Sequence, residues 1–212
     1  MNWMKKVAVA LVCLLPLGLQ AAKVDTLQVK SPSMNKSIEV VVVSPDMAAT
    51  EACPVIYLLH GYGGNARTWV GIKPDLPKIA DEKGIFFVCP DGKNTWYWDS
   101  PLNADVRYET FISDELVKYV DSHYKTVADR KGRAITGLSM GGHGAMWNGL
   151  RHSDVFSAAG STSGGVDIRP FPKNWEMSVQ IGEKAKYPEN WEKYTVINLV
   201  PTLRKDQIAL IF

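Results

Sequence analysis

The sequence is poor in the residues that mark several protein classes. Only 3 of its 212 residues are cysteine, and Cys13 lies in an apolar N-terminal segment. The other two, Cys53 and Cys89, cannot form the disulfide framework of a small secreted domain. Each borders an apolar run, which predicts two buried free thiols. No His, Cys and Asp cluster has metal-ligand spacing, so we expect no metal and no cofactor.

Neither sign of charge dominates. The chain has 24 Lys and Arg residues against 22 Asp and Glu residues, a net charge of +2. This balance gives no reason to expect nucleic acid or an anionic surface as a partner. Hydrophobic residues make up 46% and charged residues 22% of the chain, which excludes a disordered, collagen-like or coiled-coil protein. The length suits one domain and leaves the oligomeric state open.

No apolar run is long enough for a stable membrane span. The longest, Val7–Leu19, falls short of the roughly 20 residues that cross a bilayer. Lys5 and Lys6 precede it and small residues follow it, as in a secretory signal peptide. We therefore predict a signal peptide over residues 1–22 and a secreted or periplasmic protein. A membrane anchor or a buried helix is the alternative for this segment.

Short apolar runs alternate with helical patterns along the rest of the chain. Continuous apolar runs such as Val55–Leu59 are typical of strands buried on both faces of a sheet. The segments Ala104–Tyr124 and Gly144–Leu150 have helical spacing or follow a strand as a helix. This alternation predicts an α/β fold, with a mainly parallel central sheet and helices on both faces. The expected strands are Thr26–Val29, Ile38–Val43, Val55–Leu59, Ile85–Cys89, Ala134–Leu138, Val155–Ala159 and Ile208–Phe212.

Residues 164–207 differ from the segments before them. They are polar and contain Trp175, Trp191 and Tyr194, with no strand pattern until Ile208. We interpret them as a helical cap or insertion over the carboxyl edge of the sheet. No linker separates this cap, so residues 23–212 are expected to form one domain.

The strongest chemical signal is Gly137-Leu138-Ser139-Met140-Gly141, a G-x-S-x-G motif between a predicted strand and a predicted helix. In this context the serine sits on a strained turn that exposes its hydroxyl above the sheet. The glycines let strand and helix approach closely. The following helix start directs free N–H groups toward developing negative charge. We therefore predict Ser139 as a nucleophile, against a chance match.

A second motif, His60-Gly61-Tyr62-Gly63-Gly64, follows an earlier buried strand. An α/β-hydrolase supplies its second oxyanion donor at this place. The candidate donors are the backbone N–H groups of Tyr62 and Met140. A plain glycine-rich turn is the alternative for this segment alone. His60 precedes the loop across which a base would act, so we expect a structural role for it.

Five segments, LLHGYGGN, PDGKNTWYWDSP, YETFISDEL, GLSMGGHGA and STSGG, resemble the putative esterase family of the α/β-hydrolases. That family includes tributyrin, feruloyl and acetyl-xylan esterases, S-formylglutathione hydrolases and mycolyltransferases. The resemblance covers residues 26–212. It implies Ser139 as nucleophile, the Met140 amide in the oxyanion hole, and an acyl pocket from the cap and residues 94–101. The implied pocket candidates, each with a merely packed aromatic loop as the alternative, are Trp96, Tyr97, Trp98 and Asp99.

The family's acid and base have no counterpart in the chain. Of four histidines, His60, His123 and His152 lie outside reach of Ser139, and His143 points along the elbow helix. In the family the acid follows the strand that Ile208–Phe212 resembles, and the histidine lies on a later loop. Asp206 precedes this strand, and Asp167 is expected to be an incidental neighbour of the site. We expect a chain cut short at its C-terminus, without the last strands and helix.

The leading hypothesis is a serine carboxylesterase that forms an acyl-enzyme on Ser139. Its expected substrate is a small-molecule or polysaccharide ester with a short-chain or carbohydrate-linked acyl group. Without an acid and a base, this chain is expected to be inactive or impaired. The alternatives are a non-catalytic binder of carbohydrate or acyl groups, an acyltransferase, and an S-formylglutathione hydrolase.

Overall fold

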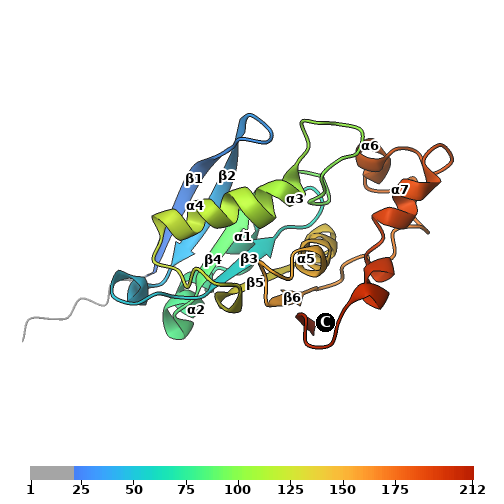
Figure 1. Cartoon of the computed structure of the whole chain (residues 1–212). Helices are drawn as coiled ribbons and strands as arrows, with labels where there is room; N and C mark the ends of the chain where they lie inside the picture. Colours follow the sequence, from blue (N-terminus) through green and yellow to red (C-terminus); the bar gives the residue numbers. More distant parts are fainter. Residues whose placement is uncertain (1–21) are drawn as a thin grey trace, which may run out of the picture.

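A computed structural model describes residues 22–212. The predicted signal peptide lies outside the described residues except for Ala22. At the centre is a seven-stranded sheet with the order β1-β2-β4-β3-β5-β6-β7 (Figure 1). The strands are β1 Lys23–Ser31, β2 Lys36–Ser44, β3 Val55–Leu59, β4 Phe86–Pro90, β5 Arg133–Gly137, β6 Ala158–Gly160 and β7 Ala209–Ile211.

The sheet is parallel from β4 to β7 and antiparallel at the β1–β2 end. β1 and β2 form a hairpin across the short turn at residues 32–35. All five residues of β4 and four of the five in β3 are buried. The predicted mainly parallel α/β sheet is therefore confirmed.

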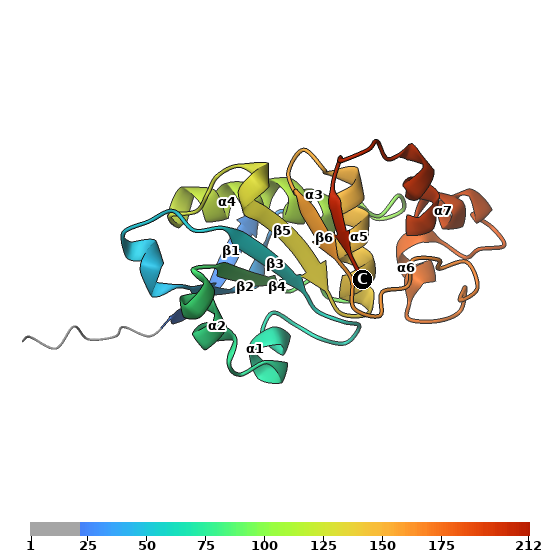
Figure 2. The ribbon, with the colours of Figure 1, turned by 90° about the horizontal axis from the view of Figure 1, so that it is seen from below.

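Helices cover both faces of the sheet. Helices α1 and α2 lie on one face, and α3, α4 and α5 lie on the other (Figure 2). The helices are α1 Thr68–Ile72, α2 Leu76–Lys83, α3 Tyr108–Thr110, α4 Leu116–His123, α5 Met140–Arg151, α6 Met177–Ile181 and α7 Pro188–Lys193. A π-helical turn, Phe111–Glu115, joins α3 to α4, and 3-10 turns span Asp46–Ala49, Arg130–Gly132 and Val196–Thr202.

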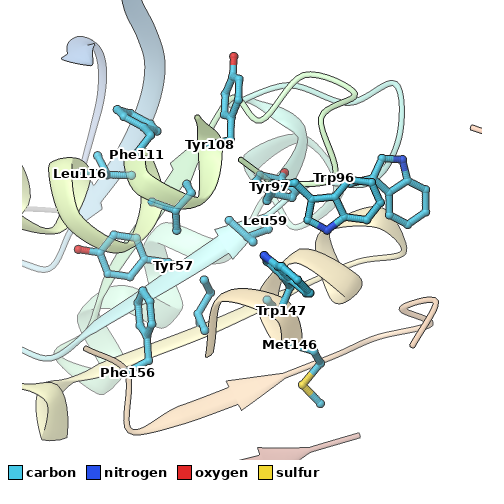
Figure 3. Packing of buried hydrophobic residues seen from close by; sticks show 14 of the residues in the cluster. Tyr57, Leu59, Trp96, Tyr97, Tyr108, Phe111, Leu116, Met146, Trp147 and Phe156 are labelled. Atoms are coloured by element: carbon cyan, nitrogen blue, oxygen red, sulfur yellow. The ribbon is translucent and has the colours of Figure 1, made fainter. Parts of the chain in front are cut away.

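The valine run of β2 shows how the sequence builds two cores. Val40 and Val42 join the larger apolar cluster under α4 and α5, whereas Val41 and Val43 join the smaller cluster under α2. Alternate residues of a strand point to opposite faces, so one run of valines serves both. In the larger cluster, Tyr57 meets Phe156 edge to face at 5.7 Å between ring centroids (Figure 3).

The two thiols lie in different clusters. Cys53 is buried in the larger cluster and Cys89 in the smaller one, and both are free. The prediction of two buried free thiols is confirmed. Within residues 22–212, no helix is both long and apolar enough to cross a membrane.

Two strand predictions need correction. The strand predicted at Val155–Ala159 is β6 at Ala158–Gly160, because the chain turns at residues 152–156 before it joins the sheet. The strand predicted at Ile208–Phe212 is the shorter β7 at Ala209–Ile211. In the described residues β7 lies at the sheet edge, pairs only with β6, and leaves Ile211 64% exposed.

The segment 164–207 carries two short helices, α6 and α7, and one 3-10 turn, joined by turns and loops. Figure 1 shows both helices grouped beyond α5, past the ends of the central strands. Side chains fix this cap to the loop after β4. The Ser100 hydroxyl donates to Gln180 O at 2.6 Å, and the Tyr194 hydroxyl donates to Asp99 O at 2.7 Å. Trp191 is fully buried within the cap.

Candidate active site

Ser139 lies at a sharp turn between β5 and α5. Its backbone has φ 55° and ψ −116°, a region that L-residues rarely adopt. Surrounding hydrogen bonds hold this conformation: Ser139 N donates to Thr162 O at 2.8 Å, and Leu138 N donates to Leu59 O at 3.2 Å. The side chain is exposed. The turn therefore presents the hydroxyl at the carboxyl end of the parallel strands, as the motif predicts.

The two motif glycines are required by close backbone approach. A Cβ on Gly141 would overlap the carbonyl oxygen of Leu59, and one on Gly137 would overlap the Gly141 carbonyl group. The strand β3, the strand β5 and the start of α5 thus meet through backbone atoms. Any side chain at these positions would force the elbow apart.

The glycine-rich loop after β3 runs beside the elbow. A Cβ on Gly61 would lie 3.6 Å from the Ser139 Cβ. The two predicted oxyanion donors are Tyr62 N and Met140 N. Neither donates a hydrogen bond to any residue within 22–212. Both residues line the same pocket as Ser139. The structure therefore brings the predicted nucleophile and two amides without a partner in residues 22–212 together in one pocket.

The pocket has a volume of about 300 Å³. One wall comes from the elbow and the loop after β3, and the other from the cap. Aromatic and aliphatic side chains dominate its lining, and Asp167 is the single charged residue among the described lining residues. The lining consists of Tyr62, Trp96, Ser139, Met140, Ser163, Gly164, Gly165, Asp167, Ile168, Phe171, Trp175 and Met177.

Of the four predicted pocket residues, only Trp96 lines the pocket. Tyr97 and Trp98 are fully buried instead, where the Tyr97 hydroxyl donates to His60 O and the Trp98 indole donates to His143 Nε2. The Asp99 carboxylate accepts hydrogen bonds from the backbone and hydroxyl groups of Thr110. The prediction does not hold for Tyr97, Trp98 and Asp99. The loop turns these side chains toward the core or toward Thr110, and only Trp96 toward the pocket. Figure 3 shows Trp96 and Tyr97 at the end of the core.

Strained backbone concentrates around the pocket. Trp96, Ser139, Ser163 and Trp175 line it with positive φ values between 49° and 60°. Non-glycine residues in this region cost about 1–3 kcal/mol each, so the surrounding structure must hold them there. Trp96 Nε1 donates to Trp175 O at 3.0 Å and thereby ties two of these residues together. Such clustering is typical of ligand and active sites.

Asn94 connects the two walls of the pocket. Its Oδ1 accepts a hydrogen bond from Gly63 N at 2.9 Å, and its Nδ2 donates to Glu176 Oε2 at 3.2 Å. Partial desolvation and a hydrogen bond with Glu176 raise the pKa of the Tyr62 hydroxyl. The oxyanion loop therefore depends on Asn94 and on the cap, since its own glycines restrain it little.

No histidine lines the pocket among the described residues. His60 is buried, with its ring nitrogens bound to Gly61 O at 2.7 Å and Gly92 N at 2.9 Å, which fits the structural role predicted for it. His123 stacks on Tyr119 within α4. His152 Nε2 lies 2.8 Å from Glu109 Oε1.

His143 is the histidine nearest to Ser139 in sequence, and it faces the interior. Its Nδ1–H donates to Gly165 O at 2.7 Å, and its Nε2 accepts from the Trp98 indole at 3.0 Å. Burial lowers the pKa of His143 to about 4, against a smaller opposing effect of the bond to Gly165. The ring is neutral at pH 7, and both nitrogens are occupied. It cannot take a proton from Ser139 in this arrangement.

Asp167 was expected to be an incidental neighbour, and the structure places it in the lining of the pocket. Both carboxylate oxygens bind the Arg169 guanidinium at 2.8 Å. The hydrogen bonds from Arg169 lower the pKa of Asp167. No sequence motif marks Asp167 or Phe171 as lining residues.

The "Putative esterase" family matches residues 31–210 of the chain. Esterase Rv1288 from Mycobacterium tuberculosis is 30% identical over 149 residues, which are 67% of this chain and 32% of that protein. An acetyl esterase from Caldicellulosiruptor saccharolyticus is 31% identical over 108 residues, which are 50% of this chain and 40% of that protein. The chain spans between about a third and a half of the length of the curated relatives it matches.

Solved structures show the same architecture. A ferulic acid esterase superposes with a TM-score of 0.69 at 28% sequence identity, covering 89% of this chain and 74% of that one. The matched family residues include both glycine-rich motifs, the strands β2 to β6 and most of β7. The chain therefore belongs to the Putative esterase family and has an α/β-hydrolase fold.

Proposed function

We propose that the chain carries the nucleophile half of a serine carboxylesterase. The observation that carries this proposal is the pocket that holds Ser139 together with the free amides of Tyr62 and Met140. Membership of an esterase family supports the same chemistry. The predicted signal peptide adds that the reaction occurs outside the cytoplasm.

Ser139 Oγ attacks the ester carbonyl carbon, and the carbonyl oxygen becomes an oxyanion. The Tyr62 and Met140 amides donate to it, and the positive end of the α5 dipole adds to this stabilisation. One such donor typically lowers the barrier by about 2.7–4 kcal/mol. The alcohol leaves with a proton, an acyl-enzyme remains on Ser139, and water releases the acid.

The Ser139 proton needs an acceptor, and no histidine within residues 22–212 lines the pocket to accept it. The histidines among them are hydrogen-bonded elsewhere. A general base contributes typically 10²–10⁴-fold. We therefore infer that this 212-residue chain alone acylates and deacylates slowly, with solvent or an added base as acceptor.

The pocket walls favour an aromatic acyl group. Trp175 lies between Trp96 and Phe171, with ring centroids at 6.4 Å and 5.5 Å respectively. These distances fall in the range in which aromatic rings interact favourably. A planar acyl group can enter such a site with little loss of its own freedom. A ferulic acid esterase of the same fold supports this class of substrate.

The test is hydrolysis of p-nitrophenyl butyrate by the 212-residue chain, with and without imidazole as an added base. Imidazole should raise the rate of the native chain more than that of Ser139→Ala. Ser163→Ala is a matched control, because Ser163 lines the same pocket and also has a φ of 55°. We expect it to keep the native rate. Equal rates for the native and Ser139→Ala chains would refute the proposal.

A non-catalytic binder of acyl esters is the second candidate. The absence of histidine from the described pocket lining favours it. Binding of an aromatic ester with no Ser139-dependent release, even in imidazole, would support this role. Burst kinetics in the same assay would exclude it.

A further inference from the structure

Asp167 stands out because the rest of the described pocket lining carries no charge. The other described lining residues are aromatic, aliphatic, glycine or serine. A charged group in such a lining is costly unless it is paired. Asp167 is paired with Arg169, and this pairing leaves part of the carboxylate open.

The open part follows from counting acceptor sites. An ionised carboxylate offers about four lone-pair positions. Oδ1 accepts from Arg169 N at 3.0 Å and from Arg169 Nε at 2.8 Å, and Oδ2 accepts only from Arg169 Nη2 at 2.8 Å among residues 22–212. One position on Oδ2 is therefore available to a ligand. The side chain is 35% exposed, so a ligand can reach it.

The carboxylate is also held in place from several sides. Arg169 binds Glu192 Oε2 at 2.8 Å, and Arg169 O accepts from Lys184 at 3.0 Å. The neighbouring Ile168 is buried in the core. Val166 O accepts from Ile197 N at 3.0 Å. A ligand hydroxyl would therefore meet an acceptor whose position is already fixed, which reduces the entropy lost on binding.

The charge of the site favours a neutral donor over a cation. Aromatic rings with an acidic residue can bind quaternary ammonium groups. Here Arg169 pairs with the carboxylates of both Asp167 and Glu192, and the ammonium group of Lys184 lies on Arg169 O. Two positive groups thus face two negative ones, so the pocket gains a hydrogen-bond acceptor without a net negative charge. A hydroxyl group fits this chemistry, since it donates one hydrogen bond and carries no charge.

We propose that Asp167 is a specificity residue whose Oδ2 accepts a hydrogen bond from a hydroxyl on the aromatic acyl group of the ester. The inference rests on the proposed function, because it concerns the substrate of that site. It selects hydroxylated aromatic acyl groups over unsubstituted or methylated ones.

The test is calorimetric binding of neutral methyl esters to the Ser139→Ala chain at pH 6.5. The probes are methyl 3- and 4-hydroxycinnamate and their methoxy counterparts, which match in ring and size but lack the donor. A hydrogen bond to a charged group contributes about 1.5–3 kcal/mol. We expect one hydroxy ester to bind about 10-fold or more tightly than its methoxy counterpart.

Asp167→Ala and Asp167→Asn should reduce this ratio to less than about threefold while methyl cinnamate still binds. The asparagine oxygen will turn to Arg169, so it should not replace the carboxylate. Glu189→Gln is the matched control: it neutralises an exposed carboxylate in the first turn of α7 that has no hydrogen bond or ion pair within residues 22–212, and it should keep the ratio.

Three outcomes would overturn the inference. If hydroxy and methoxy esters bind equally, Asp167 accepts no hydrogen bond from the substrate hydroxyl, and the proposed function still stands. Tighter binding of phenyltrimethylammonium than of any hydroxy ester makes the pocket a cation site. No binding by any aromatic ester contradicts both the inference and the aromatic pocket, whereas Ser139-dependent hydrolysis of p-nitrophenyl butyrate remains a separate test of the nucleophile.

Discussion

The two walls of the pocket are built in different ways. The elbow wall, Leu59–Gly64 with Gly137–Gly141, joins through backbone atoms that leave no room for a Cβ. The cap wall, Ser163–Met177, is held by side chains, with Trp96, Asn94 and Arg169 as its links. Under the proposed function the two walls have different tasks: the elbow wall positions Ser139 and the two amides, and the cap wall binds the acyl group.

The largest effect should come from filling the backbone contact of the elbow wall. Gly141→Ala places a Cβ onto the Leu59 carbonyl, and backbone cannot yield as a side chain can. We expect a loss of about 3 kcal/mol or more in the free energy of unfolding. Urea unfolding measures it. Gly71→Ala is the control, because Gly71 is an exposed helical glycine with nothing within 4 Å of its Cβ, and it should be neutral or slightly stabilising. A similar result for both would show that the elbow contact is not rigid.

The second effect concerns His143, which ties α5 to the start of the cap through Gly165. Its pKa is about 4 in the folded chain because of burial, and near 6.5 when unfolded. The unfolded state therefore binds the proton first, and stability is lost as the pH falls from about 6.5 to about 4. The expected loss is about 3 kcal/mol. His143→Gln should flatten the curve of unfolding free energy against pH in this window. The exposed His123→Gln should leave the curve as it is; if it flattens the curve equally, the assignment is wrong.

A third prediction removes the strain at the nucleophile. Ser139→Gly should be about 1–2 kcal/mol more stable than Ser139→Ala, because only glycine adopts the φ of 55° there without penalty. Both variants lack the hydroxyl, so their difference isolates the backbone. Thermal unfolding of the pair gives the value, and identical melting would show that the elbow is unstrained.

The smallest effect in free energy comes from the link between the walls. Asn94→Ala frees Gly63 N and the cap's Glu176. We expect the Ser139-dependent rate to fall about 10-fold, less than for loss of a whole oxyanion donor, with KM nearly unchanged. Asn103→Ala is the control, since Asn103 Oδ1 also accepts a backbone hydrogen bond, from Asp105 N, but joins no wall of the pocket. A higher KM with an unchanged kcat would mean that Asn94 supports only the cap wall and not the loop that carries the Tyr62 amide.

The same division explains what the sequence could predict. Gly137 and Gly141 are required because backbone atoms approach too closely for a Cβ. The motif therefore located the strand, the turn and the helix. Valine and phenylalanine runs located the inner strands for a similar reason, because burial on both faces demands continuous apolar residues.

The cap wall could not be predicted in this way. Trp96 and Tyr97 are adjacent and similar, and only their consecutive positive φ values send one to the pocket and the other to the core. Asp167 reaches the pocket through an ion pair with a residue two positions later, a contact that spacing alone does not reveal. Burial of β7 also depends on a neighbour strand, and the described residues supply only β6.

The most direct test of the central claim is the mass of the chain after brief incubation with p-nitrophenyl butyrate and imidazole, followed by peptide mapping. Acylation expels p-nitrophenolate, which is a good leaving group, whereas deacylation needs a base to activate water. Residues 22–212 place no histidine in the pocket lining, so the acyl-enzyme should accumulate. We predict one butyryl group on the peptide that contains Ser139 in the native and Ser163→Ala chains, and none there in Ser139→Ala. Butyryl groups spread over surface lysines, with the same pattern in all three chains, would contradict the claim that the elbow holds a nucleophile.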